Sequence, residues 1–453
     1  MTPPRETIFA LSTVPGRAAI AVVRASGPEA LVAAERLAGK LPAPRQAKLA
    51  SFRHPASGEL IDRGLLLVFP EGRSETGENM AEFQLHGGRA VVAGLLDALA
   101  TLPGLRPAEA GEFTRRAFAN GRLDLSEVEG LADLIAAETE GQRRQALRQM
   151  EGALSRLTEA WRARLLGALA HLEAVIEFPE EGLPEGLSAT VGRDILSIQT
   201  EIHQHLDNDR RGERLREGFQ VAILGAPNVG KSSLLNALAR RDAAIVSETA
   251  GTTRDVIEVT LSLDGYPVTL ADTAGLRALD AGGGQAAIEA EGIRRARARA
   301  EAADLKLAVF DLAASPALDP ATLALVDEAT LVVGNKLDLV TCATAPNIGG
   351  LTPLLVSAKR GDGMAALEDV LRAAVEARLG GEPAVVTRLR HRQALEDCAA
   401  ALARAAALGL SDKTLDLGAE ELRQAAAALG RIAGRVEVEA LLEIVFRDFC
   451  IGK

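Results

Sequence analysis

Val221-Ala-Ile-Leu-Gly-Ala-Pro-Asn-Val-Gly-Lys-Ser-Ser233 is the stretch of this 453-residue chain that decides its fold. An apolar run ends at Gly225, and the spacing from there to Gly230 and Lys231 is that of a phosphate-binding loop. Glycines let backbone N–H groups approach phosphate oxygens, and the lysine brings positive charge to the β- and γ-phosphates. A strand precedes the loop, and a helix predicted over Leu234–Arg240 adds its N-terminal dipole. The residues expected to contact nucleotide, with the Ser232 hydroxyl also a ligand for Mg²⁺, are Asn228, Val229, Gly230, Lys231, Ser232 and Ser233.

Three short motifs downstream narrow the nucleotide to GTP. Asp272-Thr273-Ala274-Gly275 ends one predicted strand; its aspartate can hold Mg²⁺ through water, and the Gly275 N–H can meet the γ-phosphate. Asn335-Lys336-Leu337-Asp338 ends a second strand, and Asp338 can accept hydrogen bonds from the N1–H and 2-amino groups of guanine, which adenine cannot supply. Ser357-Ala358-Lys359 ends a third strand, where a backbone N–H can reach the guanine O6. Because sheets of this kind bind ligands at the carboxyl ends of their strands, the three motifs together predict a GTPase.

Hydrolysis also needs a group that positions the attacking water. The segment Gly251-Thr252-Thr253-Arg254-Asp255 is typical of a switch, and Thr253 is predicted to complete the Mg²⁺ shell when the γ-phosphate is present. Leu276 stands where Ras-like proteins carry a water-orienting glutamine. Leucine has no polar side-chain atom, so the local candidates are Glu289 and Glu291.

The composition excludes several classes of protein. Hydrophobic residues make up 47% and charged residues 25%, which is ordinary for a soluble globular protein. No apolar run approaches the roughly 18 residues of a membrane span, and the N-terminus lacks a signal-peptide core. Cys342, Cys398 and Cys450 form neither a disulfide framework nor a metal pattern, which favours a cytoplasmic protein. The net charge of −11 argues against indiscriminate nucleic-acid binding.

The chain length suggests about three domains. Residues 1–120 mix predicted strands and helices in an α+β pattern, whereas 121–217 and 381–453 are predicted to be helical, beginning with a long helix from Leu123 to Phe178. Residues 218–380 contain the phosphate loop and the three motifs. We expect this α/β segment to be a Ras-like G domain inserted into a helical domain whose two parts meet in space. A C-terminal helical tail alone would struggle to bury its apolar faces, but three domains in series is the alternative.

Several of these motifs resemble those of the TrmE/Era group of bacterial GTPases: the Gly-x-Pro-Asn-Val-Gly-Lys-Ser loop, the Gly-Thr-Thr-Arg-Asp segment and the Asp-Thr-Ala-Gly-Leu-Arg element. The ending Phe449-Cys450-Ile451-Gly452-Lys453 is the most specific single feature. With the helical frame and the N-terminal domain, it is similar to the MnmE (TrmE) family of tRNA-uridine modification GTPases. The resemblance covers essentially the whole chain.

The resemblance implies more than the motifs do by themselves. The family's G domains associate face to face on K⁺ and GTP, and the positions that would hold K⁺ here are Asn228, Ser247, Thr249 and Thr252. The water-orienting glutamate matches Glu289, three residues before Gly292-Ile293. Cys450 matches a cysteine proposed to act in tRNA modification, with an inert thiol as the alternative.

The family's N-terminal domain dimerises and binds 5-formyltetrahydrofolate or a related one-carbon donor. The matching positions are Arg24, Glu82, Arg122 and Lys453. Arg122 departs from the lysine expected there but keeps the charge that a folate carboxylate needs. Leu85, before His86-Gly87-Gly88, is a second departure.

The resemblance also implies a function. It predicts a cytoplasmic, K⁺-dependent GTPase that forms a homodimer and a heterotetramer or larger complex with the FAD-containing protein MnmG. Together they would add a (carboxymethyl)aminomethyl group at C5 of the wobble uridine, position 34, of certain tRNAs. The alternative is an Era- or Der-like GTPase of ribosome assembly, which shares the G-domain motifs. The Cys-Ile-Gly-Lys ending and the lack of an appended RNA-binding module, such as a KH domain with its Gly-x-x-Gly loop, favour tRNA modification.

Overall fold

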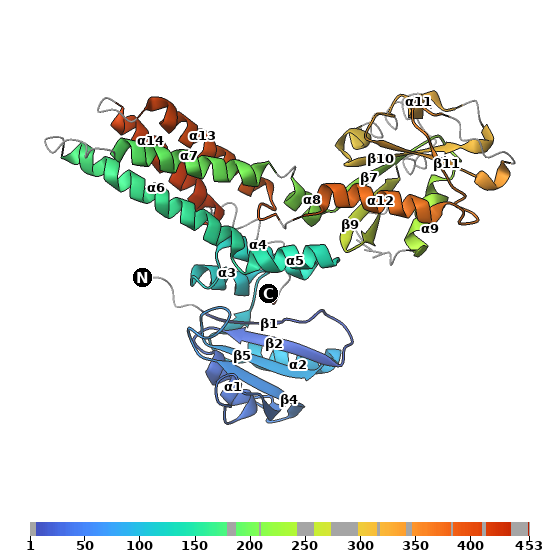
Figure 1. Ribbon diagram of the computed structural model, residues 1–453. Helices are drawn as coiled ribbons and strands as arrows, with labels where there is room; N and C mark the ends of the chain where they lie inside the picture. The colour runs from blue at the N-terminus through green and yellow to red at the C-terminus, as the bar shows by residue number, and fades with distance from the viewer. Residues whose placement is uncertain are drawn as a thin grey trace, which may run out of the picture. The chain divides into compact units, whose positions relative to one another are not determined.

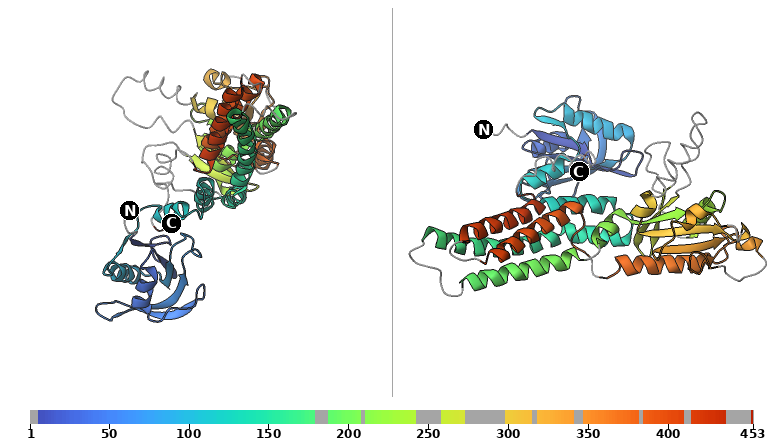
Figure 2. Two further views of the ribbon diagram at one scale, coloured as in Figure 1. Left: turned by 90° about the vertical axis from the view of Figure 1, so that its left-hand side faces the viewer. Right: turned by 90° about the horizontal axis from the view of Figure 1, so that it is seen from above.

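The computed structural model describes residues 6–178, 187–207, 210–241, 258–272, 298–314, 318–340, 347–381, 384–409, 414–435 and 452. The chain forms two compact units, shown in Figures 1 and 2. One contains residues 1–132, 149–169 and 423–453, and the other contains residues 133–148 and 170–422. Within the described residues, no helix is both long and apolar enough to cross a membrane.

The N-terminal residues fold into a six-stranded sheet of order β3-β4-β5-β2-β1-β6 (Figure 1). Helices α1 (Ala30–Ala38) and α2 (Arg89–Ala100) bury their apolar faces against one side of the sheet. On the other side, Phe113 of α3 (Glu112–Ala119) packs against Ile8 of β1. The sequence did not predict β3 or β6. The strands are β1 (Thr7–Leu11), β2 (Ile20–Ser26), β3 (Lys48–Arg53), β4 (Leu60–Phe69), β5 (Met80–His86) and β6 (Leu105–Pro107).

The single long helix predicted from Leu123 to Phe178 is wrong. The structure has three helices there: α4 (Leu125–Ala136), α5 (Glu140–Met150) and α6 (Ala153–Glu177). Before α5, the Gln142 side chain accepts a hydrogen bond from the Thr139 N–H, and the Thr139 hydroxyl accepts one from the Gln142 N–H. This reciprocal capping box starts a new helix. Before α6, Gly152 has a φ of 78°, which a continuous helix does not allow.

Helices that precede and follow the G-domain sequence pack against each other. α7 (Leu187–Leu206) and α13 (Leu389–Leu408) run side by side, as Figure 2 shows. Within residues 121–217, which are predicted to be helical, a short helix α8 (Arg211–Glu217) follows α7, and α14 (Leu415–Ile432) follows α13. The contact between α7 and α13 is what an insertion of the G domain between two helical segments requires.

The G domain is a six-stranded sheet of order β12-β11-β10-β7-β9-β8, with β8 antiparallel and the other strands parallel. Helices α9 (Lys231–Arg241) and α12 (Met364–Leu379) cover one face. The short helix α11 (Pro320–Leu323) and its flanking residues cover the other. The first strand, β7, is central, and the chain moves outward from it in both directions. The strands are β7 (Phe219–Leu224), β8 (Glu258–Leu263), β9 (Tyr266–Asp272), β10 (Leu305–Asp311), β11 (Thr330–Asn335) and β12 (Leu354–Leu355).

Candidate nucleotide-binding site and N-terminal cavity

The phosphate loop leaves the carboxyl end of β7, at the point where the strand order reverses. Gly225 has a φ of 153°, and a Cβ there would lie 2.6 Å from the Val309 carbonyl oxygen, so only glycine fits. The Lys231 ammonium donates hydrogen bonds to the carbonyl oxygens of Gly225 (2.7 Å) and Ala226 (2.9 Å). These bonds draw the two ends of the loop together and hold its lysine at the start of α9. Asn228, a non-glycine residue, adopts a φ of 62° in the middle of the loop.

Asn335 connects the phosphate loop to the predicted guanine site. Its side chain is buried; it donates to the Val229 carbonyl oxygen (2.8 Å) and accepts from the Ala358 N–H (3.1 Å). One side chain at the end of β11 therefore joins two loops that lie more than a hundred residues apart in sequence. The next residue, Lys336, pairs with Asp311 at the end of β10 (2.7 Å).

Asp338 is held in place by the third motif. The hydroxyl of buried Ser357 donates to the Asp338 carboxylate (2.7 Å), and this bond is the main cause of a lowered Asp338 pKa. The carboxylate is half-buried and ionised, as an acceptor for guanine N–H groups must be. Lys359 beside it is exposed. The structure thus brings together the described residues of the phosphate loop, the Asn335–Asp338 motif and the Ser357–Lys359 motif.

Other predicted site residues lie outside the described residues, so their placement stays a prediction. For Asp272, the backbone is described as the end of β9, opposite Ile223 of β7. The residues outside are Ser247, Thr249, Thr252, Thr253, Thr273, Ala274, Gly275, Glu289, Cys450 and Lys453. Cys398 is buried in α13, and burial raises its pKa to about 12, as for a thiol that only packs.

The N-terminal unit contains a cavity of about 460 Å³, within the size range of small-molecule sites. Two of the predicted folate residues, Glu82 and Arg122, line it. Arg24 pairs with Glu82 (2.8 Å) and with Glu75 (2.9 Å), a second acidic residue of the wall. Arg24 does not line the cavity itself, but it neutralises two carboxylates of the cavity wall. The complete lining is Arg45, Phe69, Arg73, Ser74, Glu75, Met80, Glu82 and Arg122.

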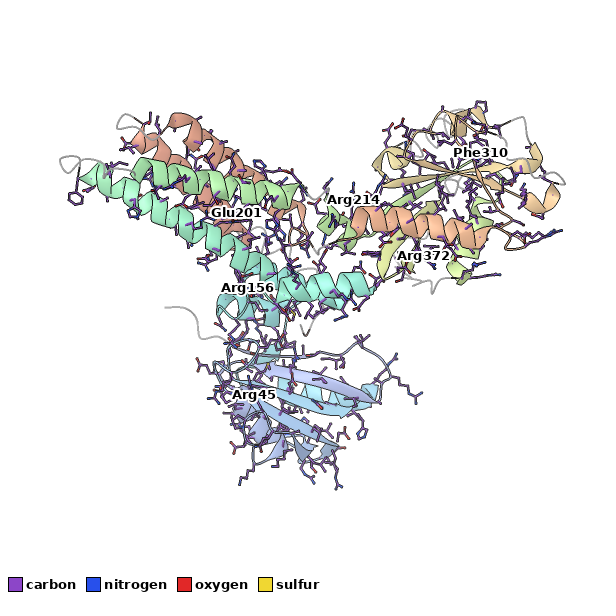
Figure 3. The ribbon with its side chains drawn as sticks, viewed as in Figure 1. Arg45, Arg156, Glu201, Arg214, Phe310 and Arg372 are labelled. Atoms are coloured by element: carbon purple, nitrogen blue, oxygen red, sulfur yellow. The ribbon has the colours of Figure 1, made fainter. Side chains whose placement is uncertain are left out.

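Sequence reasoning missed Arg45 and Arg73 of this wall. The Arg45 guanidinium, labelled in Figure 3, donates to the Arg73 carbonyl oxygen (2.8 Å). No motif marks either residue, and only the packing of the loop before β5 brings them to Arg122. With three arginines against two glutamates that Arg24 already engages, the wall favours an anionic ligand.

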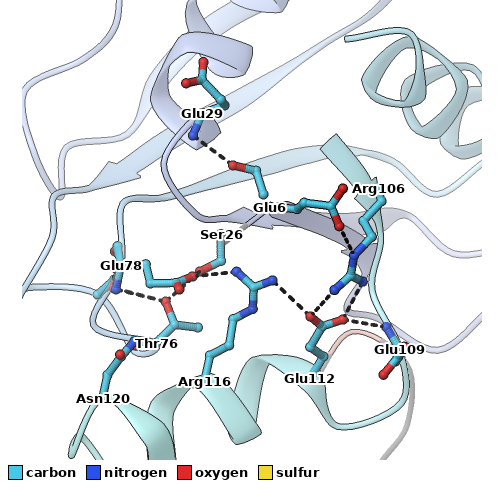
Figure 4. Close-up of polar contacts among 12 residues, drawn as sticks. Glu6, Ser26, Glu29, Thr76, Glu78, Arg106, Glu109, Glu112, Arg116 and Asn120 are labelled. Atoms are coloured by element: carbon cyan, nitrogen blue, oxygen red, sulfur yellow. Dashed lines mark hydrogen bonds and ion pairs between the residues drawn. The ribbon is translucent and has the colours of Figure 1, made fainter. Parts of the chain in front are cut away.

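A buried polar network fixes the loop that carries Arg73 and Glu75 (Figure 4). Glu78 accepts from Ser26 (2.9 Å) and Arg116 (3.0 Å), while the Asn120 side chain donates to the Thr76 carbonyl oxygen (2.7 Å). Glu112 accepts from both Arg106 and Arg116. Burial alone would raise the pKa of Glu112, but the hydrogen bonds from Arg106, the Glu109 N–H and Arg116 outweigh it and lower the pKa to about 2.

The central phosphate loop, the doubly wound sheet and the Asn335–Asp338 pair define a guanine-nucleotide-binding protein of the P-loop class. The family model described as the MnmE helical domain matches residues 125–450, and the one described as the GTP-binding protein TrmE N-terminus matches residues 7–122. The chain belongs to the MnmE family of tRNA modification GTPases. The predicted fold class, with N-terminal, helical and inserted G domains, is confirmed.

Curated relatives match over nearly their whole length. A protein of Parvibaculum lavamentivorans named tRNA modification GTPase MnmE is 58% identical over 99% of this chain and 100% of its own. One of the same name from Rhodospirillum rubrum is 53% identical over 99% of both chains. A zebrafish (Danio rerio) protein named 5-taurinomethyluridine-[tRNA] synthase subunit GTPB3, mitochondrial, is 48% identical over 100% of this chain and 94% of its own.

Proposed function

We propose that this chain hydrolyses GTP in a cycle that drives modification of the wobble uridine of certain tRNAs at C5, in the cytoplasm. The observation that carries the GTP part is the joined set of phosphate loop, Asn335, Asp338 and Ser357. The tRNA part is supported by the names of the relatives, which describe tRNA modification GTPases and a tRNA uridine synthase subunit.

The described residues fit a nucleotide with its metal ions. Ser232 is exposed at the start of α9, and its hydroxyl oxygen is of the hard type that Mg²⁺ prefers. Thr253, and Asp272 through water, would complete the Mg²⁺ shell. Exposed Asn228 offers an amide oxygen for K⁺, with Ser247, Thr249 and Thr252 as further oxygen donors. When bound, K⁺ would supply positive charge beside the phosphates, while Glu289 of this chain orients water.

The open face of the N-terminal sheet supports a homodimer. One face of the sheet, opposite α1 and α2, carries the side chains of Ile20, Leu49 and Leu65. Leu49 pairs with Leu65, and Leu65 pairs with Gln84. Gln84 is two residues from His86, the partner of Ile20, so these side chains lie on the same face. Ile20 is 61% exposed and Leu49 71% exposed. An exposed apolar face of this kind favours a second copy as its cover.

The cavity lies on the same open face, since Met80 and Glu82 alternate with the core residues of β5. We infer that a 5-formyltetrahydrofolate-type one-carbon donor binds here, its carboxylates directed to Arg45, Arg73 and Arg122. Gly452 lies against the carbonyl oxygen of Leu11 on β1. Leu11 pairs with Val23 of β2, the residue directly before Arg24. Its neighbour Lys453 is the fourth proposed ligand-binding residue.

The chemistry at the uridine needs redox groups that a GTPase site does not supply. We therefore infer that the FAD-containing protein MnmG is the partner, in a heterotetramer or larger complex. Nucleoside analysis of tRNA from cells lacking this chain tests the proposal. We expect the C5-modified wobble uridines to disappear and to return with the parent chain but not with Lys231→Ala. Unchanged wobble uridines together with immature ribosomal subunits would favour the ribosome-assembly alternative.

A further inference from the structure

A two-stranded hairpin joins the two segments of the G domain that are predicted to sense the γ-phosphate. β8 starts at Glu258, three residues after the Gly251–Asp255 segment, and β9 ends at Asp272. The strands turn at Asp264 and Gly265, which have φ values of 50° and 84°, in the manner of a tight two-residue hairpin turn. β8 is the edge strand and pairs only with β9 among the described strands. The position of the hairpin tip therefore affects both predicted γ-phosphate-sensing segments.

The tip of this hairpin is held from outside the G domain by the first turn of α5. The Gly141 N–H donates to the Gly265 carbonyl oxygen at 2.8 Å. Next to it, the Gln142 side chain donates to the Arg216 carbonyl oxygen (3.1 Å), and the buried Gln145 side chain donates to the Gly212 carbonyl oxygen (2.9 Å). Arg216 and Gly212 belong to α8, which leads directly into β7. α5 thus contacts both the hairpin tip and the helix that leads into the central strand.

The contact at Gly141 leaves no room for a side chain. A Cβ there would lie 2.8 Å from the Gly265 carbonyl oxygen and 3.1 Å from Leu215 Cδ1. The hairpin tip would have to move, because a backbone carbonyl cannot rotate aside as a flexible side chain can. At the same tip, Arg372 of α12, labelled in Figure 3, lies 3.8 Å from the Asp264 carboxylate.

We propose that α5 is a positioning element for GTP hydrolysis. Through Gly141 it sets the place of the β8–β9 hairpin, and through the hairpin it sets the segments that must meet the γ-phosphate and Mg²⁺. α5 belongs to the helical part of the chain, so the same contact couples that part to the GTP cycle. The inference rests on the proposed GTP hydrolysis, but it concerns residues of α5, which lie outside all the nucleotide-binding motifs.

The test is Gly141→Ala in the full-length chain. We expect kcat for GTP hydrolysis to fall by about fivefold or more, because small misplacements of catalytic segments carry large rate penalties. GDP affinity should stay within about twofold of the parent, because the phosphate loop and guanine site are untouched. Hydrogen exchange of residues 258–272 should become faster. Gln142→Ala adds no bulk but removes the bond to Arg216 and the capping bonds at the start of α5, so it should shift both readouts in the same direction by less.

Gly192→Ala is the matched control. Gly192 is also a helical glycine, in α7, but an added Cβ there meets no atom within 4 Å. It should behave as the parent in both readouts. A Gly141→Ala protein with parental turnover, or one with slowed turnover and unchanged hairpin exchange, would overturn the inference. Should parent and Gly192→Ala both fail to hydrolyse GTP, the proposed function itself would be at fault. If Gly141→Ala does not fold, parental GTP turnover in Gln142→Ala would overturn the proposal that α5 positions the hairpin for hydrolysis.

Discussion

At the scale of single residues, the guanine site depends on a side chain kept charged by its neighbour. The Ser357 hydroxyl lowers the pKa of Asp338, so the carboxylate remains an acceptor throughout the neutral range. Asn335 connects the two loops of the site, because its side-chain amide bonds both to the phosphate loop and to the loop after β12. Base reading and phosphate binding are thus joined by direct hydrogen bonds.

The first prediction concerns Asp338→Asn. An asparagine amide can donate to the C2 oxygen of xanthine but cannot accept both guanine donors. The preference for GTP over xanthosine triphosphate should therefore fall by at least about a hundredfold, as is usual when a hydrogen-bonding site loses its match. Competition binding measures the ratio. Asp369→Asn, an exposed change on α12, is the control, and an unaltered GTP preference in Asp338→Asn would refute the base-reading role.

The second prediction concerns Arg24→Ala. Because Arg24 neutralises Glu75 and Glu82, its loss leaves two carboxylates uncompensated beside the cavity. Calorimetry with 5-formyltetrahydrofolate should show affinity lower by about tenfold or more, the cost of leaving charged groups unpaired. Arg115→Ala, which removes an exposed ion pair with Glu109, should bind as the parent does. Equal affinity in Arg24→Ala would exclude Arg24 from the site.

At the scale of elements, the junction of β6 with α3 shows how a buried charge network stabilises a loop. Arg106 on β6 and Arg116 on α3 both pair with Glu112, and Arg116 continues to Glu78 (Figure 4). Glu112 is buried at 3% exposure, so removing its charge takes away the carboxylate that the two arginines share and leaves Arg106 with Glu6 and Arg116 with Glu78. Removing one partner of a buried ion pair destabilises a protein more than replacing the whole pair by apolar residues.

The third prediction follows from the Glu112 pKa of about 2, which lies below its ordinary value of 4.5. A carboxyl whose folded pKa is lowered adds stability above its unfolded pKa and loses it as pH falls toward the folded pKa. Glu112→Gln should thus lower the free energy of unfolding of the N-terminal sheet by about 2–3 kcal/mol at pH 7. The difference should shrink between pH 4.5 and pH 2.

Hydrogen exchange of peptides from residues 6–122 in increasing urea, at pH 7 and pH 3, measures this difference. Glu109→Gln is the control, because the Glu109 side chain is 69% exposed and its pair with Arg115 lies at the surface. A pH-independent effect of Glu112→Gln would show that the loss is one of packing rather than of charge.

At the scale of the whole molecule, two proposed contacts between copies of the chain have different origins. The N-terminal sheet face carries the exposed apolar side chains of Ile20, Leu49 and Leu65, so it should associate without nucleotide. The G domains, in contrast, are proposed to associate only with K⁺ and GTP. The two contacts can be separated by experiment.

The fourth prediction is that Ile20→Asp weakens the nucleotide-free dimer. A charge placed in an apolar interface should raise the dimer dissociation constant by about tenfold or more. Sedimentation velocity without nucleotide measures it. Leu196→Asp, on α7 with its side chain 55% exposed, is the matched control and should remain dimeric. A fully dimeric Ile20→Asp chain would place the interface elsewhere.

The fifth prediction compares GTP turnover in K⁺ and Na⁺ at equal ionic strength. Na⁺ is smaller, so oxygen donors spaced for K⁺ should hold it poorly, and turnover should be much slower. Glu289→Ala should lower kcat by about a hundredfold or more with little change in GTP affinity, as for an interaction made mainly in the transition state. Equal rates in the two salts would refute the cation mechanism, and a fully active mutant would assign the water to Glu291 or another group.

The nucleotide chemistry of this protein was readable from the sequence alone. A phosphate loop requires glycines and a lysine at fixed short spacings, and a guanine site requires an aspartate directly after a strand. Such local requirements leave a signature within a few consecutive residues, as at Gly225–Ser232 and Asn335–Asp338. Most elements with strong periodicity were predicted for the same reason.

Only the tertiary structure decided which distant residues meet. Arg45 and Arg73 join Arg122 in one cavity wall, and Gly141 meets Gly265, although no local pattern relates these positions. The breaks that separate α4, α5 and α6 were also missed, because an amphipathic pattern continues through them while the capping pair Thr139 and Gln142 is a weak signal. Contacts between residues far apart in sequence depend on how whole helices and strands pack, and a local sequence pattern does not specify that packing.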